Sequence, residues 1–235
     1  MSLPAYGDIP EPRPPERAGL SLLADILVAP ARAYATIAAT RAWLPAFIVV
    51  MTLTVVGALL LAPALEHLIT IDPTLAGSSP ADVKTMTGHA VADFLQSQVI
   101  GSLVLWLWTA AVMTTLARTG PRTFGLYFAL AANTALPAAL GNFIFALVIS
   151  LHDPHAYANL SQLNRAVPDN LAVFEPHDKD RAVGFLASFD LFTLWSTLLL
   201  AFGVQAIGHV RLLWALIAAF SLWLAYALLQ TFSTF

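Results

Sequence analysis

The sequence predicts an all-α polytopic membrane protein, a bundle of five transmembrane helices with an N-terminal amphipathic interfacial helix. Hydrophobic residues make up 58% of the 235 residues and charged residues only 11%, whereas soluble domains average about 25% charged residues. The charges are also segregated, because five uncharged runs approach or exceed the roughly 20 residues that a bilayer requires. These runs are 42–65, 94–117, 123–151, 191–208 and 212–235.

The region before the first span divides into two parts. Residues 1–18 are polar and proline-rich, which predicts a disordered cytoplasmic tail. Residues 19–41 carry apolar side chains at helical spacing, which predicts an amphipathic helix lying on the inner leaflet and bent or restarted at Pro30. The alternative is a stub that packs under the bundle. The remaining chain, 42–235, is the predicted transmembrane domain, with outer loops at 66–93 and 152–182.

Two of the predicted spans carry polar features. The third is interrupted by Asn133 and Pro137 among small residues, so we expect a kink at the centre of the bundle. A broken helix that lines a substrate path is the sharper alternative. The fourth span is expected to begin upstream of Asp190, which puts this carboxylate in the outer third of the membrane. Its insertion cost there is below the roughly 2.5–3.5 kcal/mol of the membrane centre.

The distribution of charge predicts the orientation of the chain. The segments before the first span, between the second and third, and between the fourth and fifth hold seven basic and four acidic residues. The alternate segments hold four basic and nine acidic residues. The positive-inside rule therefore predicts a cytoplasmic N-terminus and a periplasmic C-terminus. Nine arginines against two lysines, with abundant alanine, suggest a bacterial gene, so we expect the cytoplasmic (inner) membrane.

Few residues could carry chemistry. The chain has no cysteine, no nucleophile elbow, no Walker loop and no zinc-protease motif, so neither catalysis nor a cofactor is predicted. His152 and His155 are three residues apart, which makes them weak candidates for metal ligands, with solvated loop histidines as the alternative. The sequence has no basic patch, so nucleic-acid binding is not predicted. The expected partners are the lipid bilayer and either a second copy of the chain or other membrane proteins.

Three segments resemble the motifs of one known family. They are Ile26-Leu27-Val28-Ala29-Pro30 followed by Tyr34 and Ile37; Phe124 through Pro137; and Phe189-Asp190-Leu191-Phe192-Thr193-Leu194-Trp195 followed by Gly203. Their order and spacing resemble the Yip1 family of five-span membrane proteins, particularly its bacterial branch. The resemblance implies five helices and a cytoplasmic N-terminus, and it singles out Asp190, Trp195 and Gly203. Eukaryotic members are associated with vesicle trafficking and with prenylated small GTPases, while for bacterial members the family implies a fold rather than an activity.

Three functions stay open on the sequence alone. The first is a non-enzymatic scaffold or membrane-organising protein that acts through helix packing. The second is a small transporter or channel whose path is lined by Asp190, Asn133 and the Pro137 kink. The third is an outward-facing metal or pH sensor that uses the loop histidines.

Overall fold

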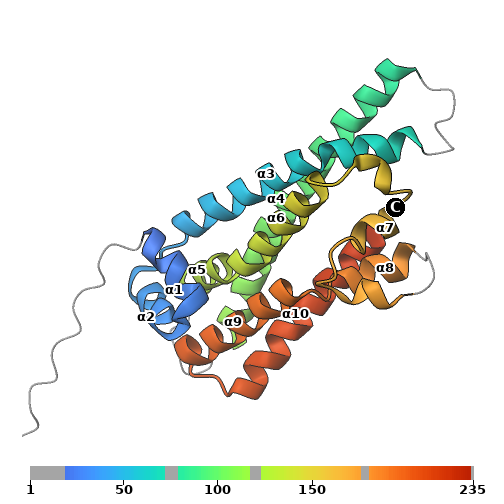
Figure 1. Ribbon diagram of the computed structural model, residues 1–235. Coiled ribbons are helices and arrows are strands. Elements are labelled where there is room, and N and C mark those ends of the chain that lie inside the picture. The colour runs from blue at the N-terminus through green and yellow to red at the C-terminus, as the bar shows by residue number, and fades with distance from the viewer. Residues whose placement is uncertain (1–18, 72–78, 117–122, 176–179, 234–235) are drawn as a thin grey trace, which may run out of the picture.

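The computed structural model describes residues 19–71, 79–116, 123–175 and 180–233. Within these residues the chain is all-α, without a strand, and its long helices run between the two ends of the molecule (Figure 1). The helices are α1 (Leu20–Val28), α2 (Pro30–Thr40), α3 (Leu44–Thr70), α4 (Pro80–Leu116), α5 (Phe124–Thr134), α6 (Leu136–Ser150), η2 (Pro154–Ala156), α7 (Leu160–Asn164), η3 (Leu171–Phe174), α8 (Asp180–Ala187), α9 (Leu191–Gly208) and α10 (Leu212–Ser233), where η marks a 3-10 helix.

Four helical segments of the described chain are long and apolar enough to cross a membrane. They are α3, α4, the combined α5 and α6 (Phe124–Ser150), and α9. The last helix, α10, adds a shorter apolar stretch, Leu212–Leu228. The predicted class, an all-α membrane protein, is confirmed, while the fifth span stays a prediction.

The two ends of the bundle differ in charge. α1, α2 and the α9–α10 turn lie at one end (Figure 1), which we call the basic end because it carries Arg32, Arg41 and Arg211. α7 and α8 lie at the other end, which we call the acidic end because Asp153 and Asp169 lie in its loops. The opposite signs of these ends follow the segregation of charge along the sequence.

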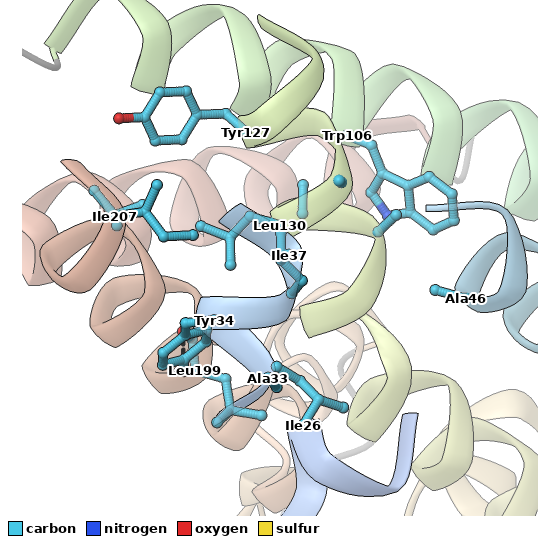
Figure 2. Packing of buried hydrophobic residues seen from close by; sticks show 14 of the residues in the cluster. Ile26, Ala33, Tyr34, Ile37, Ala46, Trp106, Tyr127, Leu130, Leu199 and Ile207 are labelled. Atoms are coloured by element: carbon cyan, nitrogen blue, oxygen red, sulfur yellow. Dashed lines mark hydrogen bonds between the residues drawn. The ribbon is translucent and has the colours of Figure 1, made fainter. Parts of the chain in front are cut away.

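The N-terminal amphipathic segment is two helices, and its apolar face is buried inside the protein. Pro30 opens α2, because proline is tolerated in the first turn of a helix but not in its interior. The Asp25 carboxylate pairs with the Arg32 guanidinium across this break. Ile26 and Ile37 are fully buried in the core that these helices share with α5 and α9 (Figure 2). The restart at Pro30 agrees with the prediction, and the burial of the apolar face fits the alternative of a stub packed under the bundle, while the position on the inner leaflet stays a prediction.

The segments predicted as outer loops contain helices. α3 continues to Thr70 and α4 starts at Pro80, so most of the predicted loop 66–93 is helical. A charge-free run measures the length that crosses a membrane, but a helix continues past that run wherever its charged side chains reach water. The predicted loop 152–182 contains η2, α7, η3 and the start of α8. The predicted tail 1–18 lies outside the described residues.

The predicted third span is formed by α5 and α6, which follow each other through Ala135, a residue whose backbone is itself helical and accepts a hydrogen bond from the Ala139 N–H. α5 ends at Thr134 and α6 starts at Leu136, with Pro137 in the first turn of α6, where its missing N–H costs no helical hydrogen bond. The Ala138 N–H instead donates to the Ser196 hydroxyl oxygen of α9 over 3.0 Å. A neighbouring helix therefore satisfies the backbone at the break, which a broken helix inside a membrane requires.

Candidate functional site

Asp190 is the N-cap of α9. Its carboxylate accepts a hydrogen bond from the Thr193 N–H over 2.8 Å. α8 ends at Ala187, and a short antiparallel bridge between Asn170 and Asp190 separates it from α9. The prediction that the span begins upstream of Asp190 is therefore wrong. The acid starts the helix, because a carboxylate at this position satisfies an amide that has no partner within the first turn.

A cavity of about 360 Å³ opens beside Asp190 at the acidic end. Asp169 and Asp190 line this outer cavity, and no basic side chain of the described residues does. Burial raises the pKa of the Asp190 carboxyl above its usual range. Hydrogen bonds from Thr193 oppose this increase, and the negative charge of Asp169 adds to it. The outer cavity therefore has a negative character that varies with pH.

A second cavity of about 190 Å³ adjoins the first on the side of the middle of the bundle. Five residues line both cavities, namely Gln98, Asn142, Thr193, Trp223 and Tyr226. We call the two adjoining cavities together the cleft. Its deep part reaches the break between α5 and α6, where Thr134, Ala138 and Ser196 line it. The cleft thus runs from the two carboxylates to the interrupted helix.

Asn133 and Pro137 lie outside the cleft. Asn133 is fully buried, and its Nδ2 donates to the carbonyl oxygens of Ala42 over 2.7 Å and Ala129 over 2.8 Å. It ties α5 to the linker between α2 and α3. Pro137 is buried as well and shapes the break without lining the cleft. Thr134, rather than Asn133, lines the predicted path at this point.

The residues of the three family-like segments contact one another. The Tyr34 hydroxyl donates to the Leu199 carbonyl oxygen of α9 over 2.8 Å (Figure 2). A Cβ added to Gly203 would lie 2.5 Å from Leu130 Cδ1 and 3.0 Å from Tyr34 Cε1, so this glycine lets α2 and α5 approach α9. Trp195, in contrast, is 39% exposed and lines neither cavity.

His152 and His155, the two candidate metal ligands, each contact a different part of the chain. The His155 ring packs edge-on against His67 of α3, with ring centroids 4.3 Å apart and planes at 74°. The Nδ1 of His152 lies 2.7 Å from the Val148 carbonyl oxygen. Among the described residues, no group of three or more His, Asp or Glu side chains is arranged to hold a metal ion. His177 lies outside the part of the chain that the structure describes.

Several cleft residues were not among the predicted site residues. Gln98 and Asn142 are amides inside otherwise apolar helices, and polar side chains at membrane depth are a signal for function that the sequence contains. Asp169 and Ser188 had no such signal, because they lie in the segments around α8 and reach the cleft only through the fold. The sequence therefore identified Asp190 and missed most of its neighbours.

The helices define the class of protein, a polytopic all-α membrane protein, and two carboxylates line a cavity at its acidic end. The chain belongs to the Yip1 family, because the family model described as Yip1 domain matches residues 24–233. This match confirms the resemblance seen in the sequence. No curated protein and no solved structure matches the chain.

Proposed function

We propose that this Yip1-family protein is a small, non-enzymatic transporter that binds a cationic solute in the cleft. The observation that supports this function most is the cleft itself, which joins two carboxylates at the acidic end to a broken helix in the middle of the bundle. Transporters commonly bind their substrates near the membrane centre beside discontinuous helices. The interrupted backbone hydrogen bonding at Pro137 and Ala138, between α5 and α6, gives this chain a comparable point.

The lining of the cleft favours a cation over other solutes. Asp169 and Asp190 supply negative charge, and Gln98 and Asn142 supply amide oxygens that can accept hydrogen bonds or bind a cation. Trp223 adds an aromatic ring, a group that attracts organic ammonium ions. An anion would meet two carboxylates and no described basic side chain. The chemistry therefore favours a small organic or inorganic cation.

The orientation belongs to the same proposal. The positive-inside rule puts the basic end in the cytoplasm, so the cleft opens to the outside of the cytoplasmic membrane of a bacterial cell. Arg32, Arg41 and Arg211 of the described chain support this orientation. Arg118 and Arg122, the basic residues between the second and third predicted spans, lie outside the described residues.

A thermal-shift panel on the purified protein tests the solute class. Organic ammonium ions and metal cations are compared with neutral and anionic solutes of similar size. We expect one cation class to raise the unfolding temperature by about 5–10 °C at a hundredfold excess over its Kd. This shift should disappear on acidification, and at a higher pH than for an exposed aspartate, because the raised pKa of Asp190 means that its carboxylate is neutralised earlier.

Two asparagine variants provide the control for this panel. Asp190→Asn removes the charge but keeps an N-cap side chain, since asparagine caps helices about as well as aspartate. Asp153→Asn makes the same change at the N-cap of η2, where Asp153 accepts a hydrogen bond from the His155 N–H and does not line the cleft. We expect the cation shift to be lost in the first variant and kept in the second. Equal shifts with neutral or anionic solutes would contradict the proposal.

A scaffold or membrane-organising role is the second candidate, and one observation favours it. α1 keeps two large apolar side chains away from the core, with Leu20 73% and Val28 78% exposed. At the basic end these side chains can enter a leaflet or contact a partner protein. If Leu20→Ser or Val28→Ser weakened binding to a partner protein or to the membrane while cation binding stayed intact, this second role would be favoured.

A further inference from the structure

A groove at the basic end is separate from the cleft. It has a volume of about 590 Å³ and lies between the end of α4 and the α9–α10 turn. Met113, Val204 and Ala215 form a buried apolar floor, and Trp214, 60% exposed, forms a wall. The volume lies within the range of about 300–1,000 Å³ that is typical of small-molecule sites. The groove can therefore hold a ligand with a substantial apolar part.

One end of the groove is polar. His209 and Arg211 line it, and both side chains are exposed in the α9–α10 turn. The turn is fixed against α5, because a Cβ added to Gly208 would lie 2.9 Å from the Tyr127 hydroxyl oxygen. Among the described residues, no carboxylate forms an ion pair with Arg211. Arg211 also directly precedes α10, whose N-terminal amides favour a negative charge.

We propose that this groove binds an anionic phospholipid of the leaflet at the basic end. The apolar floor matches an acyl chain, and Arg211 with His209 matches the phosphate group. A free phosphate ion would leave the floor unoccupied, while a zwitterionic phospholipid would bring its own cation close to Arg211. Basic pockets between membrane helices are suited to anionic lipid headgroups. Leu116 and Ile217, each 46% exposed, continue the apolar wall to the surface that a bilayer covers.

Quenching of tryptophan fluorescence by brominated lipids tests this site. The full chain is reconstituted in phosphatidylcholine vesicles that contain phosphatidylglycerol or phosphatidylethanolamine with brominated acyl chains. The chain has six tryptophans, so the signal of Trp214 is obtained as the difference between the wild type and Trp214→Phe. We expect Trp214 to be quenched at an about fivefold lower mole fraction of phosphatidylglycerol than of phosphatidylethanolamine, the ratio that one basic residue near the membrane surface supplies.

Control positions distinguish binding in the groove from general contact with lipid. Trp108 of α4 is also 60% exposed but does not line the groove, so its quenching should not depend on the headgroup. Arg211→Gln should abolish the preference seen at Trp214, while Arg41→Gln, an exposed arginine at the same end, should keep it. Equal quenching of Trp214 by both lipids in the wild type overturns the proposal. The proposal is also overturned if Arg211→Gln keeps the preference for phosphatidylglycerol, or if the protein forms a dimer in which neither lipid reaches Trp214.

Discussion

Gly203→Val is expected to destabilise the bundle strongly. A Cβ at this position would lie 2.5 Å from Leu130 Cδ1 and 3.0 Å from Tyr34 Cε1. Neither neighbour moves easily, because Leu130 is fully buried and Tyr34 is held by its hydrogen bond to Leu199. Overpacking of a core typically costs about 1–3 kcal/mol, and more where the neighbours are fixed. Yield, gel-filtration profile and thermal midpoint of the purified protein measure the effect.

Gly125→Val is the matched control for this substitution. Gly125 lies in α5, and no atom lies within 4 Å of a Cβ built there. The same change in residue type should therefore leave the yield and the thermal midpoint close to those of the wild type. If Gly203→Val proved as stable as Gly125→Val, the close approach of α2, α5 and α9 at Gly203 would be wrong.

Gly141→Ala is expected to lower the free energy of unfolding by about 1–3 kcal/mol or more. A Cβ at Gly141 would lie 2.6 Å from the Cβ, Cγ and Cδ2 atoms of Phe192. A change of rotamer cannot relieve this contact, because the Phe192 Cβ is itself involved. The helices α6 and α9 would have to separate, and the outer cavity, which Gly141 lines, would change shape.

A double-mutant cycle with Phe192→Gly isolates this contact. Removing the Phe192 side chain takes away the atoms that meet the new methyl group, so the double variant should be more stable than the sum of the single effects predicts. Interaction energies between residues in contact are about 0.5–3 kcal/mol. Gly184→Ala, in open space on α8, is the control that should show little change. Additive effects of Gly141→Ala and Phe192→Gly would be the contrary result.

The class of fold was predictable because the bilayer imposes it on composition. Long uncharged runs and segregated charges are direct consequences of crossing lipid, and they hold whatever the helices contact. The number of residues in each helix was not predictable in this way. α4 begins at Pro80, well before its uncharged run, since charged residues are compatible with helix outside the membrane.

The roles of particular residues depended on contacts that no local pattern contains. Amphipathic spacing in α1 and α2 reports that one face is buried, but a lipid leaflet and a protein core produce the same pattern, and Ile26 and Ile37 face the core. Asp190 was recognised as unusual, yet its capping role depends on the chain turning at Asn170 and Ala187. Its neighbours in the cleft come from α4, α6 and α10, which only the tertiary structure brings together.

The proposed transport of a cation requires the cleft to be a water-filled, negatively charged space between Asp190 and the junction of α5 and α6. The chain has no cysteine, so single cysteines can report on this directly. Asn142→Cys tests the part shared by both cavities, and Ser102→Cys tests the deeper part. Leu194→Cys, exposed on α9 but outside the cleft, and the fully buried Ala201→Cys are the controls.

Reaction of these variants in membrane vesicles with charged thiol reagents that do not cross lipid is the most direct measurement. We expect modification at Asn142→Cys and Ser102→Cys, with a cationic reagent faster than an anionic one by about tenfold because of the carboxylates at the entrance. Leu194→Cys and Ala201→Cys should not react. Modification restricted to a cysteine at the mouth, such as Ser188→Cys, with no reaction at Asn142→Cys or Ser102→Cys, would contradict the account.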